Sequence, residues 1–168
     1  LYHPDTEVGK QLAHRLHMPT PRIALGQALA NGGLATAMMD VSDGLAQDLG
    51  HLCQQSKVAI RLDLEKLPTS APLQQVDLGE RLRCQLTGGD DYELIFTVPA
   101  HVDLSQYLLS SMTTQVTCIG EVIATDELEK GIAGPNIKLT YQGTAVTEQN
   151  PFPFNDFPDL EGYQHFRG

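Results

Sequence analysis

Two carboxylates and a hydroxyl lie where a strand is expected to give way to a helix. The apolar run 37–39 predicts a short buried strand that stops at Asp40. Ser42 and Asp43 follow it, and Gly44 is the turn residue before an amphipathic helix. Backbone N–H groups at a helix N-terminus are unpaired and partly positive, so they favour phosphate. Two carboxylates beside a phosphate indicate a magnesium ion shared between protein and phosphate oxygens.

A structural interpretation competes for the same residues. Serine and aspartate before a helix are ordinary N-caps, and we expect Ser42 or Asp43 to cap the helix at about 45–55. Capping accounts for one polar residue and leaves Asp40 unexplained. The pattern alone leaves both interpretations open.

A second group of polar residues is the stretch Gly88-Gly-Asp-Asp-Tyr-Glu-Leu94. A glycine pair lets the backbone turn sharply or approach a ligand closely. Three carboxylates in four residues are costly to gather unless a cation or donor meets them. We predict a strand over 91–98, in which Asp91 and Glu93 share a face while Asp90 stays in the loop, freer to reach a ligand. The alternative is a solvated acidic loop.

Composition excludes several classes of partner. The chain has 168 residues and a net charge of −10, which argues against nucleic acid or an anionic membrane as a partner. Its length suits one domain, 1–168. No apolar run has the length of a membrane span and no signal peptide is visible. The three cysteines are widely spaced, which indicates thiols in a reducing cytoplasm.

The predicted elements interleave helices and strands without strict βαβ regularity. This order favours an α+β fold with a mixed β-sheet covered by helices. The expected helices span residues 4–17, 22–30, 45–55, 78–86 and 104–112. The expected strands span 57–64, 91–98 and 116–124, with hairpin arms at 137–141 and 143–146.

Taken together, Asp40-Val-Ser-Asp-Gly-Leu45 and Gly88-Gly-Asp-Asp-Tyr-Glu-Leu94 resemble the C-terminal half of the thiamine-monophosphate kinase family. Weaker matches are Pro19-Thr-Pro-Arg22, Cys118-Ile-Gly-Glu121 and Gly162-Tyr-Gln-His-Phe166. The order and spacing agree across essentially the whole chain. This family belongs to the aminoimidazole-ribonucleotide-synthetase-like (AIR-synthase-like) superfamily.

The resemblance implies an ATP-dependent enzyme that phosphorylates thiamine monophosphate to thiamine diphosphate by direct in-line transfer. It implies a C-terminal α/β/α domain with partial ferredoxin-like topology. By family analogy Asp40 and Asp43 would be Mg²⁺ ligands and Ser42 would touch ATP. Asp90, where the family usually has Glu, would contact the thiamine moiety, and Tyr163 would stack on its aminopyrimidine. No residue is expected to act as a catalytic nucleophile.

The resemblance further implies a longer, cytoplasmic, homodimeric protein whose N-terminal domain supplies most nucleotide contacts. This chain would then fold alone but lack kinase activity. Two alternatives remain. One is another ATP-dependent enzyme of the superfamily, of the selenophosphate synthetase, AIR synthetase or hydrogenase-maturation type. The other is a non-catalytic module for ligand binding or oligomerisation.

Overall fold

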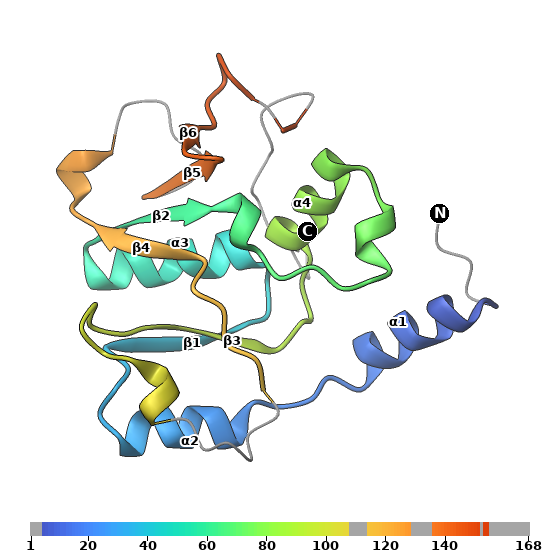
Figure 1. Ribbon diagram of the computed structural model, residues 1–168, viewed down its shortest axis with the longest axis horizontal. Helices are drawn as coiled ribbons and strands as arrows, with labels where there is room; N and C mark the ends of the chain where they lie inside the picture. Colours follow the sequence, from blue (N-terminus) through green and yellow to red (C-terminus); the bar gives the residue numbers. More distant parts are fainter. Residues whose placement is uncertain (1–4, 108–113, 129–135, 152, 155–168) are drawn as a thin grey trace, which may run out of the picture. The chain divides into compact units, whose positions relative to one another are not determined.

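The structure, a computed structural model, describes residues 5–107, 114–128, 136–151 and 153–154 (Figure 1). The chain divides into two compact units. The first comprises Leu1–Ser42 and Asp90–Val116, and the second comprises Asp43–Gly89 and Thr117–Gly168. The chain therefore passes from one unit to the other within each polar motif, between Ser42 and Asp43 and between Gly89 and Asp90.

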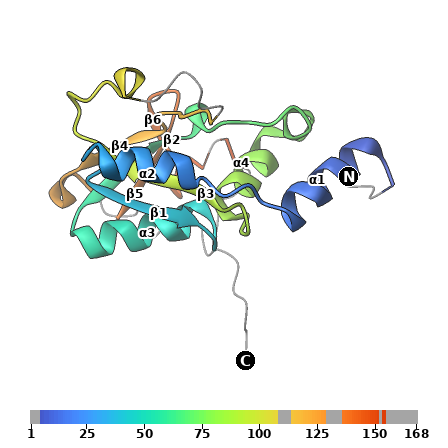
Figure 2. The same cartoon turned by 90° about the horizontal axis from the view of Figure 1, so that it is seen from below.

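The first unit is a two-stranded antiparallel ribbon with helices. Its elements are α1 (Glu7–His17), α2 (Ile23–Asn31), β1 (Ala37–Val41), β3 (Glu93–Thr97) and a 3-10 turn (Leu104–Gln106). Thr6 caps α1, since its hydroxyl accepts the N–H of Gly9 at 3.0 Å. The helix α2 lies along the ribbon (Figures 1 and 2), and its buried Leu25 and Leu29 pack with Leu94 of β3. This small core supports the end of β1 and the start of β3.

The second unit is a mixed sheet with two helices. Its elements are α3 (Leu45–Ser56), β2 (Ala59–Asp63), α4 (Leu78–Thr87), β4 (Gly120–Ile123), β5 (Ile137–Tyr141) and β6 (Thr144–Ala145), with 3-10 turns at Leu64–Lys66, Leu73–Gln75 and Thr125–Glu127. The strand order is β4-β2-β5-β6, in which β2 and β5 are parallel and the other pairs antiparallel. Alternation buries Leu62 and Leu139, which are register partners, while α3 packs against β2 and β5.

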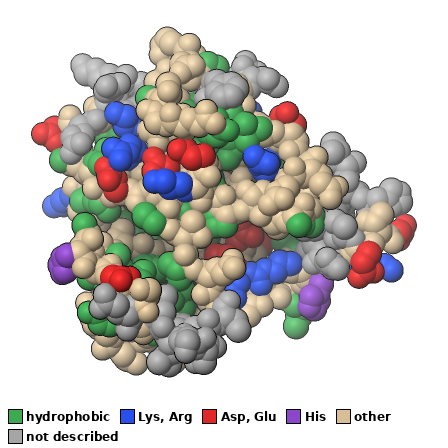
Figure 3. All heavy atoms as spheres, in the orientation of Figure 1, with side chains coloured by type: hydrophobic (Ala, Val, Ile, Leu, Met, Phe, Trp, Pro, Cys, Tyr) green, Lys and Arg blue, Asp and Glu red, His purple; other side chains and the backbone are tan. Residues whose placement is uncertain are grey.

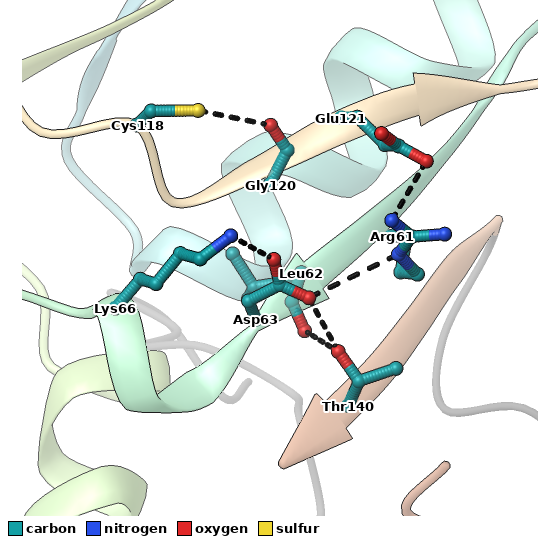
Figure 4. A network of polar contacts seen from close by, with 8 residues as sticks. All are labelled: Arg61, Leu62, Asp63, Lys66, Cys118, Gly120, Glu121 and Thr140. Carbon is teal, nitrogen blue, oxygen red and sulfur yellow. Dashed lines mark hydrogen bonds and ion pairs between the residues drawn. The ribbon is translucent and has the colours of Figure 1, made fainter. Parts of the chain in front are cut away.

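A polar network covers part of the sheet of the second unit (Figure 4). Asp63 accepts hydrogen bonds from Lys66 and Thr140, both at 2.6 Å, and Arg61 pairs with Glu121 at 2.8 Å. Burial is the largest single influence and would raise the pKa of Asp63, but the hydrogen bonds from Lys66 and Thr140 and the charges of Lys66 and Arg61 together lower that pKa. Figure 3 shows acidic and basic side chains side by side over β2 and β4. The network links β4, β2 and β5.

The predicted α+β class is confirmed. The helix expected over 4–17 begins at Glu7, after the cap Thr6, and the helix expected over 78–86 begins at Leu78, after the cap Asp77. The strands form two sheets rather than one, a two-stranded ribbon and a mixed four-stranded sheet. Of the helix predicted over 104–112, the structure has a 3-10 turn at Leu104–Gln106, and residues 108–113 lie outside the described residues. None of the helices that the structure describes is long and apolar enough to cross a membrane.

Three predicted strand boundaries are wrong. The first strand continues through Asp40 to Val41, because these residues pair with Leu94 and Glu93 of β3. The strand predicted from Asp91 begins only at Glu93, since Tyr92 has a left-handed backbone with φ 51°. Asp91 and Glu93 therefore do not share a strand face. The strand predicted from 116 begins at Gly120. A side chain at Gly120 would collide with the carbonyl oxygen of Arg61.

Candidate functional site

The two polar motifs meet through their backbones in the first unit. The carbonyl oxygen of Val41 accepts the N–H of Tyr92 at 2.8 Å, and that of Ser42 accepts the N–H of Asp90 at 2.9 Å. Asp40 lies one residue earlier in β1 with an exposed side chain. The structure thus brings Asp40, Ser42 and Asp90, predicted from distant parts of the sequence, to one end of the ribbon.

Asp90 and Tyr92 line a hollow of about 530 Å³. The Tyr92 hydroxyl donates to the Asp90 carboxylate at 3.2 Å, and Tyr92 is 41% exposed. Both residues have left-handed backbones, with φ of 63° for Asp90 and 51° for Tyr92. Such a backbone is costly for an aromatic residue, and strain of this kind concentrates at ligand sites. The opposite wall consists of Leu16, His17 and Pro19.

An ion cluster lies next to this hollow in sequence and in space. Glu93 accepts hydrogen bonds from Arg22 Nε at 2.7 Å and Arg22 Nη2 at 2.6 Å, and it also pairs with Arg15. The hydrogen bonds from Arg22 are the main reason that the pKa of Glu93 is lowered. The pKa of the neighbouring Asp91 is raised, first by partial burial and then by the charge of Glu93. The arginines are thus directed to Glu93 and not into the hollow.

Asp43 opens the second unit at the turn before α3. Its N–H and that of Gly44 both donate to the Asp48 carboxylate, at 3.1 and 3.3 Å, and Asp48 is 1% exposed. Gly44 has φ 125°, a region open to glycine, and a side chain there would lie 3.1 Å from the Thr87 carbonyl. The carboxylate of Asp43 accepts a long hydrogen bond from Gln47, at 3.4 Å.

The predicted cap of α3 is wrong. The N-cap residue is Gly44, with no side-chain capping bond, because the helix begins later than a cap at Ser42 or Asp43 requires. The carboxylate of Asp48, which lies in the first turn of the helix, accepts a hydrogen bond from the N–H of Gly44. One of the N–H groups expected to meet phosphate is therefore already bonded. Asp43 therefore does not cap α3, and the capping interpretation does not account for its carboxylate.

The donor set of this segment fits magnesium. Asp40 and Asp43 are three positions apart and supply carboxylate oxygens, the ligands that Mg²⁺ prefers. Among the described residues no group of three or more His, Cys, Asp or Glu side chains is arranged to hold a metal. Magnesium ions shared with phosphate commonly take one or two protein carboxylates and complete their shell with phosphate and water.

Sequence reasoning missed Tyr92 and Asp48 as site residues. Tyr92 was assigned to a strand face, and the sequence carries no signal for its left-handed backbone. Asp48 belongs to the helical pattern as a polar residue, and its spacing of four from Gly44 was the available signal. Tyr163, predicted to stack on the substrate, lies outside the described residues.

A second hollow, of about 480 Å³, lies over the polar network of the second unit. Its lining includes Arg61, Asp63 and Thr140, whose polar groups already bond within that network. The first hollow differs, because within the described residues no Lys, Arg or His pairs with Asp90. Asp90 therefore remains a negative charge available to a ligand.

The chain is similar to known proteins over most of its length. The family model for AIR synthase related protein, C-terminal domain, matches residues 3–132. The thiamine-monophosphate kinase of Salmonella typhimurium is 40% identical over 160 residues, covering 92% of this chain and 42% of that protein. The thiamine-monophosphate kinase of Escherichia coli K12 is 41% identical over 164 residues, covering 96% of this chain and 44% of that protein. This chain thus spans less than half the length of these relatives.

Solved structures agree with this relationship. The crystal structure of thiamine-monophosphate kinase from Stenotrophomonas maltophilia superposes with a TM-score of 0.66 at 37% identity, covering 82% of this chain and 40% of that one. AaThiL complexed with AMPPCP and TMP superposes with a TM-score of 0.60 at 30% identity, covering 84% and 40%. The family model and these structures match more than half of the chain, so it belongs to the AIR synthase related proteins as a C-terminal domain with thiamine-monophosphate kinases among its relatives.

Proposed function

We propose that the protein containing this chain transfers a phosphoryl group from ATP to thiamine monophosphate. The observation that carries this proposal is the hollow in which Asp90 and Tyr92 lie together. Thiamine has a cationic thiazolium and a flat aminopyrimidine, which suit a carboxylate and an aromatic face. The names of the relatives support the proposal, as does the structural neighbour that binds AMPPCP and TMP.

The charges around the hollow also favour a cationic ligand. Both nearby arginines, Arg15 and Arg22, are bonded to Glu93. Asp90 accepts only from a neutral hydroxyl, so its negative charge is uncompensated among the described residues. Among the described residues no positively charged side chain has to be displaced from Asp90 before a cation in the hollow gains its attraction.

The phosphoryl groups are proposed to meet at the 40–43 segment. Asp40 and Asp43 supply the oxygen ligands for Mg²⁺, and the Ser42 hydroxyl binds ATP. When bound, magnesium neutralises charge on the phosphate oxygens. The chain's own residues position donor and acceptor, and direct in-line transfer needs no nucleophile from the protein.

We further propose that this chain is the C-terminal domain of a two-domain, homodimeric and cytoplasmic kinase. The relatives are more than twice as long as this chain, of which they match nearly all. Leu16, Met18 and Ile23 expose large apolar side chains that a further domain would cover. The three cysteines are all free, as expected in a reducing compartment.

The isolated chain is expected to show no measurable kinase activity, because most nucleotide contacts are assigned to the other domain. The measurement is production of thiamine diphosphate from ATP and thiamine monophosphate, by the purified chain and by the intact protein. Turnover by the chain at a rate comparable to that of the intact protein would refute the two-domain proposal.

Replacing Tyr92 with alanine in the intact protein is expected to raise the Kd for thiamine monophosphate about tenfold, because an aromatic contact with a cation is worth about 0.5–2 kcal/mol and the Asp90 hydrogen bond is also lost. Tyr92→Phe keeps the ring and should have a smaller effect. Isothermal titration calorimetry measures both.

Tyr107→Ala is the matched control, since Tyr107 is another exposed tyrosine of the first unit that does not line the hollow. Its Kd should equal that of the wild type. Equal affinities for the Tyr92→Ala and Tyr107→Ala proteins would remove Tyr92 from the binding site.

A further inference from the structure

One carboxylate joins three elements of the first unit. Glu93, the first residue of β3, bonds Arg15 in the last turn of α1 and Arg22 at the N-cap of α2. The Arg22 contact uses two nitrogens and both carboxylate oxygens, a planar bidentate arrangement. Such a fork fixes orientation as well as distance, which a single lysine contact does not.

This cluster adjoins both groups of residues that line the hollow. Arg15 directly precedes Leu16 and His17, which form one wall, and Glu93 directly follows Tyr92 of the other. Within this chain Leu16 is 54% exposed, while the adjacent Arg15 bonds Glu93 of β3. Among the side chains that the structure describes, the ion pair of Arg15 with Glu93 links the end of α1 to β3.

The exposure of the pairs limits their contribution to stability. Arg15 and Glu93 are each 43% exposed, and exposed pairs contribute little to folding free energy. A carboxylate that bonds two guanidinium groups is instead suited to holding the end of α1 and the start of α2 in a defined position against β3. The effect of losing it should appear in ligand affinity more than in the melting temperature.

We propose that Glu93 is a positioning residue that holds the α1 wall against Asp90 and Tyr92 and so sets the width of the hollow for a flat cationic ligand. The proposal rests on the proposed function for the identity of that ligand. It assigns no contact between Glu93 and substrate. Glu93 acts through Arg15 and Arg22, both of which it already bonds.

The test compares Glu93→Gln with Glu121→Gln in the intact protein. Glu121 is the control because it is a partly exposed glutamate that pairs with an arginine, Arg61, and it lies in the second unit, away from the hollow's lining residues. Three quantities are compared: Kd for thiamine monophosphate, KM for ATP, and amide hydrogen exchange of residues 13–17. The melting temperature of each variant is recorded as a check on folding. A third variant, Arg15→Gln combined with Glu93→Gln, tests whether both residues act through one contact.

For Glu93→Gln we expect the Kd for thiamine monophosphate to rise about tenfold, because small misplacements of binding groups are costly. Exchange in residues 13–17 should become faster, while KM for ATP and the melting temperature stay near wild type. The double variant should bind no more weakly than Glu93→Gln alone. Glu121→Gln should match the wild type in all three measurements.

Unchanged affinity with unchanged exchange would overturn the proposal. Weaker binding without faster exchange would also overturn it, because Glu93 would then be a direct contact. If the wild type does not bind thiamine monophosphate but Glu93→Gln still accelerates exchange in α1, the attachment by Glu93 stands and the proposed substrate is wrong.

Discussion

Replacing Asp43 with alanine in the intact protein is expected to lower kcat about 10³-fold, because a metal contributes several kcal/mol of charge stabilisation and each 1.36 kcal/mol is tenfold in rate. The fold should survive. The turn before α3 is held by Asp48, which bonds the N–H groups of Asp43 and Gly44, and the Asp43 side chain has no part in those bonds. The measurements are steady-state kinetics over a magnesium titration, and thermal unfolding.

Asp77→Ala is the control for Asp43→Ala. Asp77 is a true cap, since its carboxylate accepts the N–H of Gly79 at 3.1 Å at the start of α4. Its removal should cost about 1 kcal/mol of stability and leave kcat unchanged. An Asp43→Ala enzyme with wild-type kcat and magnesium dependence would remove Asp43 from the metal site.

Replacing Asp48 with alanine is expected to lower the free energy of unfolding by about 3 kcal/mol, because each hydrogen bond to a buried charged group contributes about 1.5–3 kcal/mol. Asp48 is 1% exposed and bonds two backbone N–H groups, which alanine would leave without this acceptor. Urea denaturation of the intact protein, followed by a probe in this unit, measures the loss.

Asp48→Asn keeps the shape of the side chain but removes its charge, so its stability shows how much of the loss in Asp48→Ala is due to the charge. Its amide oxygen still accepts a backbone N–H, so it should lose about 1 kcal/mol, the typical difference between charged and neutral hydrogen bonds. An Asp48→Ala protein as stable as the wild type would show that the Asp43–Gly44 turn is held by other contacts.

The sequence alone predicts the elements whose structure depends on neighbouring residues, such as amphipathic helices and tight turns. The spacing of Leu49, Leu52 and Cys53 gave the buried face of α3, and all three are buried. The Gln142-Gly143 turn was also predictable, since both residues have the positive φ, 49° and 75°, that a tight hairpin needs.

The site depended on contacts that the sequence does not encode locally. Asp90 and Tyr92 acquire their backbones by bonding Ser42 and Val41, residues far away in the chain. The alternation of polar and apolar residues predicts an extended backbone from residue 91 onward. For this reason Tyr92 was placed in the strand and not among the site residues. Glu93 also depends on distant residues, because its two partners are Arg15 in α1 and Arg22 at the N-cap of α2.

The most direct test of the central claim is phosphoryl transfer by the intact protein. The protein would be incubated with ATP, Mg²⁺ and thiamine monophosphate, and the products followed by ³¹P NMR. We predict thiamine diphosphate and ADP in equal amounts, formation that requires Mg²⁺, and formation about 10³-fold slower by the Asp43→Ala protein. ATP consumption without thiamine diphosphate, or thiamine diphosphate formation at the wild-type rate by Asp43→Ala, would contradict it.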